Sequence, residues 1–190
     1  MKTTRLFLAG AMMLAAVACG QKGVKSNGIA NEETTAAEQE PALEEKYAPQ
    51  VSIGTEVQDF TVQTADGQEF TLSSLRGEYV ILDFWASWCG DCRAEIPAVK
   101  ALRDEFAPKG VQFVGFSLDN DAEAWHKCIE ENGMDWLQVS NLIKWKENPV
   151  AAFYGMVWIP TMFLIDKEGK IAAYAMTAET MKGLLSGINL

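Results

Sequence analysis

The sequence predicts an α/β fold, a sheet with helices on both faces. Nearly continuous apolar runs of strand length at residues 79–85 and 111–118 predict two strands that are buried on both sides. A segment with helical character follows each run, at residues 93–106 and 121–132. This alternation of strands and helices is typical of a layered α/β domain. A hydrophobic fraction of 48% is sufficient for a core and excludes a wholly disordered chain.

A β-hairpin is predicted at the start of this domain, which we place at residues 51–190. The Asp66–Gly67 pair separates residues 60–63 from residues 69–72 and is typical of a tight hairpin turn. A further turn is expected at residues 73–77. The elements predicted to close the domain are the two strands of a second hairpin and a last helix, at residues 161–165, 171–174 and 177–188.

The formal net charge of -10 bears on possible partners. Proteins that bind nucleic acid take much of their affinity from lysine and arginine side chains that neutralise phosphates. This acidic chain has no such excess of positive charge, so we expect no nucleic-acid partner.

Residues 1–18 have the pattern of a secretory signal peptide. Lys2 and Arg5 precede an apolar run of 12 residues, 6–17, and small residues follow it. At about 1.5 Å per residue, this run is too short to cross a hydrocarbon core of about 30 Å.

The residues at the end of this segment, Ala16-Val17-Ala18-Cys19-Gly20, resemble the bacterial lipobox, although Ala16 stands where leucine is usual. The resemblance implies that Cys19 is lipidated and becomes the mature N-terminus, giving a periplasmic protein anchored to a membrane. The alternative is ordinary cleavage after Ala18, which leaves a free thiol.

Residues 20–50 are polar and show no apolar periodicity, so we interpret residues 19–50 as a lipidated N-terminus and a flexible tether. A helix over residues 38–47 is the alternative for part of this segment.

The cysteine pair Cys89 and Cys92 is the main candidate for chemistry. Two intervening residues leave almost no loop to close, so a bridge between the two cysteines restricts the unfolded chain little. The pair lies where a buried strand ends and a helix begins. Unpaired N–H groups and the helix dipole stabilise a thiolate at Cys89 there, and a thiolate is the species that attacks disulfides. Cys92, one turn later, can resolve the mixed disulfide.

The segment DFWASWCGDC at residues 83–92 resembles the active-site strand and motif of thioredoxin, and RAEIP at residues 93–97 continues as in the TlpA/ResA branch. The segment WIPT at residues 158–161 is similar to the cis-proline loop of that family. The resemblance implies a thioredoxin-like fold with a central mixed sheet, a redox-active Cys89–Cys92 pair, and export with attachment to a membrane.

Further site residues follow from the resemblance. It implies that Pro160, with Ile159 before it, faces the cysteines and helps to hold a substrate backbone, and Trp88 lies next to the thiol. Asp83 matches the buried aspartate of thioredoxin and is expected to accept a proton from Cys92, with a raised pKa. Glu95 matches a glutamate that the TlpA/ResA branch places near its cysteines.

Both carboxylates have a structural alternative. Asp83 could face outward from its strand, and Glu95 could be a solvated residue in the first turn of its helix.

Asp91 departs from the usual pattern of the family, in which proline is the most frequent residue at this position. A carboxylate beside Cys89 disfavours the thiolate, which predicts a reducing pair.

The remaining candidate residues are expected to have structural rather than chemical roles. A zinc site needs four ligands, and only His126, Cys128 and carboxylates remain besides the pair, so we expect no metal and no separate cofactor. His126 and Cys128 do not share a helix face, and Cys128 is expected to be a buried small hydrophobe. Asp119 and Asp121 are expected to end a strand and cap a helix. Four tryptophans are expected mainly to pack, with the lining of a substrate groove as the alternative: Trp125, Trp136, Trp145 and Trp158. Of these four, only Trp158, shortly before the expected cis-proline, has a position that supports a site role.

The leading functional hypothesis is therefore a thiol-disulfide oxidoreductase that reduces disulfides of exported client proteins and is recharged by an upstream thiol electron donor. The first alternative is a peroxiredoxin-like peroxidase, although the Pro-x-x-x-Thr-x-x-Cys loop of such enzymes is absent around Cys89. The second is a tethered binding module in which the cysteine pair is only a brace.

Overall fold

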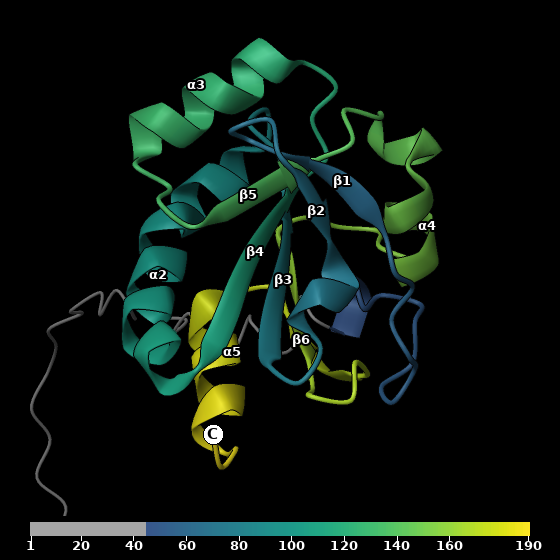
Figure 1. Cartoon of the computed structure of the whole chain (residues 1–190), viewed down its shortest axis with the longest axis vertical. Coiled ribbons are helices and arrows are strands. Elements are labelled where there is room, and N and C mark those ends of the chain that lie inside the picture. The colour runs from purple at the N-terminus through teal and green to yellow at the C-terminus, as the bar shows by residue number, and fades with distance from the viewer. Residues whose placement is uncertain (1–44) are drawn as a thin grey trace, which may run out of the picture. The chain divides into compact units, whose positions relative to one another are not determined.

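The computed structural model describes residues 45–190, which form a seven-stranded mixed sheet with helices on both faces (Figure 1). The strand order is β2-β1-β5-β4-β3-β6-β7. Strands β3, β4 and β5 are parallel, and the other pairings are antiparallel. The strands are β1 (Thr61–Thr64), β2 (Glu69–Thr71), β3 (Tyr79–Trp85), β4 (Val111–Ser117), β5 (Leu137–Ser140), β6 (Thr161–Ile165) and β7 (Ile171–Ala175).

Helices α2, α3 and α5 lie on one face of this sheet and α4 lies on the other (Figure 1). Parallel neighbours need crossover connections, and the β3–α2–β4 and β4–α3–β5 units supply them. The helices are α2 (Gly90–Phe106), α3 (Ala122–Asn132), α4 (Pro149–Tyr154) and α5 (Ala178–Ser186). Short 3₁₀ helices are η2 (Leu72–Leu75), η3 (Ala107–Lys109) and η4 (Trp145–Glu147).

The predicted mixed sheet flanked by helices is confirmed, with differences at element ends. Helix α2 begins at Gly90 rather than at residue 93, because Cys89 serves as its N-cap. The Asp121 carboxylate caps α3, as predicted. Strand β5 and helix α4 are not predicted from the sequence, because their four and six residues are too short to show a clear periodicity.

Gly115 lies at the centre of three residues that pair across strands β3, β4 and β5. Asp83 of β3 pairs with Gly115 of β4, and Gly115 pairs with Gln138 of β5. A Cβ atom at Gly115 would lie 2.1 Å from Oε1 of Gln138. The same oxygen accepts a hydrogen bond of 3.0 Å from Nε1 of buried Trp85. The missing side chain at Gly115 therefore makes room for a polar contact in the core.

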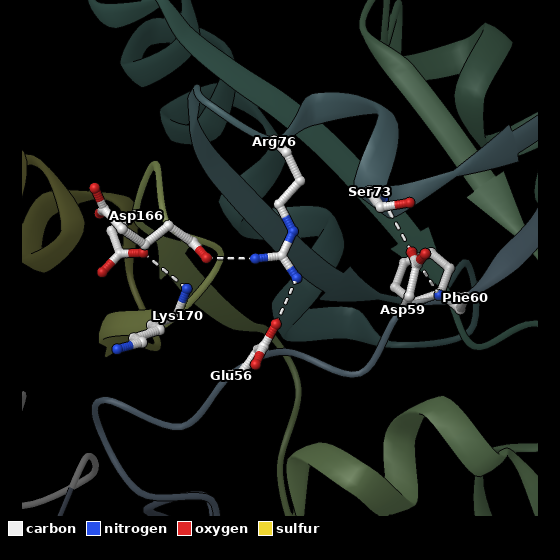
Figure 2. A network of polar contacts seen from close by, with 8 residues as sticks. Glu56, Asp59, Phe60, Ser73, Arg76, Asp166 and Lys170 are labelled. Carbon is white, nitrogen blue, oxygen red and sulfur yellow. Dashed lines mark hydrogen bonds and ion pairs between the residues drawn. The ribbon is translucent and has the colours of Figure 1, made fainter.

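The segment before β1 covers the outer edge of β7. Gly54 N donates to the Ile171 carbonyl at 2.7 Å, and Val57 N donates to the Gly169 carbonyl at 3.0 Å. The Arg76 guanidinium then joins the Glu56 carboxylate, at 3.0 Å, to the backbone carbonyl of Glu168 (Figure 2). These contacts protect an edge strand that would otherwise offer unpaired backbone groups.

The Asp59 carboxylate fixes the start of the first hairpin (Figure 2). Its Oδ1 accepts hydrogen bonds from Phe60 N at 3.0 Å and from Ser73 N at 2.9 Å. Residues 59–60, which precede the hairpin, are thereby joined to η2, which follows it.

Residues 45–50, which the sequence analysis gave to the tether, pack on the domain. The Tyr47 ring stacks on Trp158, with centroids 4.4 Å apart, and Gln50 N donates to the Gly155 carbonyl at 3.1 Å. Pro49 is buried. These contacts join distant parts of the chain, which sequence patterns do not reveal, and the domain boundary at residue 51 stays a prediction. The predicted signal peptide, the Cys19 lipidation site and the tether up to residue 44 lie outside the described residues.

Within residues 45–190, no helix combines the length and the apolar character needed to cross a bilayer.

Gly115→Ala should lower the free energy of unfolding by about 1–3 kcal/mol, because the new methyl group must displace Gln138. Urea denaturation followed by tryptophan fluorescence measures this effect. Gly183→Ala in α5 is the matched control, since a Cβ atom there meets nothing within 4 Å. It should raise stability by up to about 1 kcal/mol. Equal effects of the two substitutions would contradict this account of the sheet.

Candidate active site

A disulfide joins Cys89 and Cys92 at the junction of β3 and α2. Cys89 is the N-cap of the helix, in extended backbone conformation, and the two Cα atoms are 5.3 Å apart. Cys92 N donates a hydrogen bond of 3.1 Å to Cys89 Sγ. An N–H group of the first helical turn is thus directed at the sulfur, as expected from the position of the pair in the sequence.

The loop before β6 lies against this sulfur. The Ile159–Pro160 peptide bond is cis, as the resemblance implied. The Ile159 carbonyl oxygen lies 3.7 Å from Cys89 Sγ. Both cysteines are largely buried, with Cys89 8% exposed and Cys92 3% exposed.

Asp83 is buried in the middle of β3, so the outward-facing alternative is wrong. Its Oδ1 has no hydrogen-bond partner among the described residues. Burial, with a smaller contribution from the nearby charge of Glu95, raises the pKa of Asp83 from 3.8 to about 7. This carboxyl group can therefore exchange a proton near neutral pH.

Glu95 lies on α2 three residues after Cys92, so the two side chains share one side of the helix. Its Oε1 accepts a hydrogen bond of 2.6 Å from Ala178 N, in the first turn of α5. Glu95 is half-buried, which contradicts the alternative of a solvated first-turn residue. The charge of Glu95 raises the pKa of Asp83. A residue of α2, the helix that carries the cysteines, thus acts on a carboxyl group buried in β3.

Trp88 is 53% exposed and stacks on Trp145, with ring centroids 6.2 Å apart. Trp125 and Trp136 are buried and belong to the core, as predicted. Trp145 was assigned to packing, and its place beside the active-site motif is a correction. Sequence reasoning lacked a signal for this contact, because 57 positions separate the two residues (145 − 88).

Asp119 is a site residue that sequence reasoning missed. Its buried carboxylate accepts hydrogen bonds from Ser87 N at 2.9 Å, from Ser87 Oγ at 2.7 Å and from Ser117 Oγ at 2.7 Å. The Arg93 guanidinium donates to the Ser87 carbonyl from the other side. Asp119 therefore fixes the backbone immediately before Trp88 and Cys89. An aspartate directly after a buried strand, at the edge where the cysteines lie, is the signal that could have found it.

Comparison with known proteins assigns this arrangement to a family. The family model described as AhpC/TSA matches residues 53–174, which is more than half of the chain. The chain belongs to the AhpC/TSA family.

Among relatives in this family, the thiol-disulfide oxidoreductase ResA of Bacillus thuringiensis is 30% identical over 141 residues, or 73% of this chain and 79% of the relative. The thioredoxin domain of a thiol-disulfide oxidoreductase from Bacteroides vulgatus is 31% identical, with a TM-score of 0.67 over 72% of this chain and 97% of that one. A thiol-disulfide oxidoreductase from Bacteroides fragilis is 29% identical, with a TM-score of 0.65 over 70% and 98%.

These relatives and the bonded Cys89–Cys92 pair identify this AhpC/TSA member as a thiol-disulfide oxidoreductase that cycles between a dithiol and a disulfide. The likeness to ResA that the sequence motifs indicated is confirmed.

The third cysteine of the domain, Cys128, is free and buried in α3, as predicted. Burial raises the pKa of its thiol, and the charge of Asp119 adds to this effect. His126, on the same helix, is exposed. Within residues 45–190, no three His, Cys, Asp or Glu side chains come together as a metal site.

Asp83→Asn should change how stability depends on pH in the oxidised protein. The folded-state pKa of Asp83 is raised, so this group favours folding below pH 4 and loses that contribution as the pH rises to about 7. The variant lacks this loss and should gain about 4 kcal/mol on the parent between pH 4 and pH 8. Urea denaturation across this range measures the difference.

Glu95→Gln is the matched variant, because it keeps an acceptor for Ala178 N and removes the charge that raises the pKa of Asp83. It should shift the loss of stability to lower pH. Parallel pH profiles for the parent and Asp83→Asn would show that the Asp83 carboxyl titrates as a solvated group.

Proposed function

We propose that this oxidoreductase reduces disulfides of exported client proteins, with Cys89 as the attacking thiol and Cys92 as the resolving thiol. The observation that carries the proposal is the position of Cys89 Sγ, 3.1 Å from Cys92 N and 3.7 Å from the Ile159 carbonyl. The first contact stabilises a thiolate, and the second places the sulfur beside backbone that can hold a client strand.

In the first step, the Cys89 thiolate attacks one sulfur of the client disulfide. The client S–S bond breaks, a mixed disulfide between Cys89 and the client forms, and the other client sulfur leaves as a thiolate that takes a proton. Trp88, Ile159 and Pro160 form the surface that meets the client chain.

In the second step, Cys92 gives up its proton and attacks Cys89 Sγ. The mixed disulfide breaks, the Cys89–Cys92 disulfide forms, and the second client thiol leaves, so two electrons pass from the enzyme to the client. Asp83 is the proposed proton acceptor, since a carboxyl group with a pKa of about 7 is matched to this transfer near neutral pH. Glu95, whose charge helps to raise that pKa, is the positioning residue of the pair.

The N-terminal residues support a proposed location. A signal peptide at residues 1–18 and a lipid on Cys19 would place the domain outside the cytoplasm and on a membrane, with residues 20–44 as the tether. An exported reductase then needs an upstream thiol donor that returns the Cys89–Cys92 disulfide to the dithiol.

Insulin reduction in the presence of dithiothreitol tests the proposal. Cys89→Ser should abolish the catalysed rate, because no attacking thiol remains. Cys92→Ser, reduced beforehand and mixed with insulin after dithiothreitol is removed, should accumulate a mixed disulfide with the client, visible by non-reducing electrophoresis and mass spectrometry. Cys128→Ser, which removes the buried free thiol of α3, is the control and should keep the parent rate. A catalysed rate that survives Cys89→Ser would refute the assignment.

Asp91→Pro should make the pair more oxidising. Asp91 is an exposed acidic residue in the first turn of α2, between the two cysteines, and its charge opposes the Cys89 thiolate. Removal of this charge stabilises the reduced form, so the reduction potential should rise. Equilibration of both proteins in dithiol buffers measures the change, and Asp91→Ala separates the effect of charge from that of the proline ring. An unchanged or lower potential in both variants would contradict a role for this carboxylate.

A further inference from the structure

A cavity of about 560 Å³ lies between residues of the N-terminal segment, α4 and the loop before the cis-proline. Its volume lies within the range of about 300–1,000 Å³ that is usual for small-ligand sites. The reaction proposed above does not use it. The lining residues that matter here are Gln50, Trp145, Lys146, Ala152, Met156 and Val157.

Most of this lining is apolar. Lys146 is the one charged residue among the lining residues, and Val157 is 47% exposed. This exposed aliphatic side chain forms part of the concave, mostly apolar lining.

Two of the lining residues, Trp145 and Val157, link the cavity to the redox site. Trp145 stacks on Trp88, which precedes Cys89 in the chain. Val157 precedes Ile159 by two residues, and the Ile159 carbonyl lies 3.7 Å from Cys89 Sγ. A polypeptide that presents a disulfide to Cys89 therefore has this cavity beside its path.

Gln50, in the segment before β1, forms part of the cavity wall, and contacts of residues 47–50 with the domain fix its position. Gln50 N donates to the Gly155 carbonyl at 3.1 Å, Tyr47 stacks on Trp158, and Pro49 is buried. A fixed wall is preorganised for binding, because no segment has to be ordered when a client arrives.

We propose that this cavity is a subsite for client polypeptide, and that it takes an apolar side chain near the cysteine that Cys89 attacks. The proposal rests on the reductase function proposed above and adds a preference in the client sequence. Clients with a leucine or another apolar residue at that place are preferred. Clients with a carboxylate there are disfavoured by the cost of burying a charge, because Lys146 is the one cation in a mostly apolar lining.

The test uses two peptides, each with its cysteine in a mixed disulfide with glutathione. They differ only in the residues two positions to either side of the cysteine, which are leucine in one peptide and aspartate in the other. The second-order rate constant for reduction by the reduced full chain is measured for each. The parent should prefer the leucine peptide about tenfold or more, as expected for an apolar pocket.

Ala152 is exposed on α4 and lines the cavity, so Ala152→Phe fills it. This variant should lose most of the preference for the leucine peptide. Ala101→Phe is the matched control, an exposed alanine on α2 outside the cavity, and should keep it. Val157→Lys is a second variant on a loop, where a new side chain is readily accommodated. It should shift the preference towards the aspartate peptide, an effect that misfolding would not produce.

An equal preference in the parent and both cavity variants, or none in the parent, would overturn the subsite. Faster reduction of both peptides by Ala152→Phe would show that the cavity holds the chain's own N-terminal residues. Loss of a dimer in that variant would assign it to a second copy, and either result overturns a client subsite. Reduction of hydroxyethyl disulfide by the parent separates the subsite proposal from the reductase proposal. If the parent fails to reduce this small disulfide, the reductase function itself is refuted.

Discussion

The constraint on which the site depends is the short connection, residues 86–89, between the end of β3 and the start of α2. Strand β3 lies between β4 and β6, so pairing on both sides fixes where it ends. The helix begins at the next residue, Gly90, and an N–H group of its first turn meets Cys89 Sγ. The cis-proline loop enters β6, the antiparallel neighbour of β3, and this brings the Ile159 carbonyl to the same sulfur. A reactive position thus results from sheet pairing and one helix cap.

The same burial acts on Asp83, the proposed acid–base group. Asp83 belongs to β3, which ends four residues before Cys89, and the packing that fixes this strand also removes its carboxyl group from water. A charge is costly there, so its pKa moves towards neutrality, and Glu95 on α2 adds to the shift. In the proposed reaction, the proton acceptor for Cys92 is therefore a carboxyl group of the core rather than a solvent-exposed base. Gly115, the neighbour of Asp83 on β4, leaves the adjacent space to Gln138.

The sequence was sufficient to predict the parts of this arrangement that depend on local pattern. The apolar run of β3, the helical spacing of α2 and the cysteine pair at their junction follow from neighbouring residues. The cis-proline was identified through resemblance to thioredoxin, and Asp83 through its place in an apolar run together with that resemblance. Contacts between distant segments could not be predicted, and these include Ser87–Asp119, Trp88–Trp145 and Tyr47–Trp158. Each joins residues at least 32 positions apart, and periodicity contains no information on such pairs.

The reduction potential of the Cys89–Cys92 pair tests the central claim most directly. It is measured on the full chain equilibrated in dithiol buffers of known potential, with Cys128→Ser as the control that removes the free thiol of the domain. The account predicts a value near that of thioredoxin, about -270 mV, because the pair donates electrons to clients. A value near about -120 mV, the range of a strong oxidant, would show that the enzyme forms disulfides in its clients and would contradict the account.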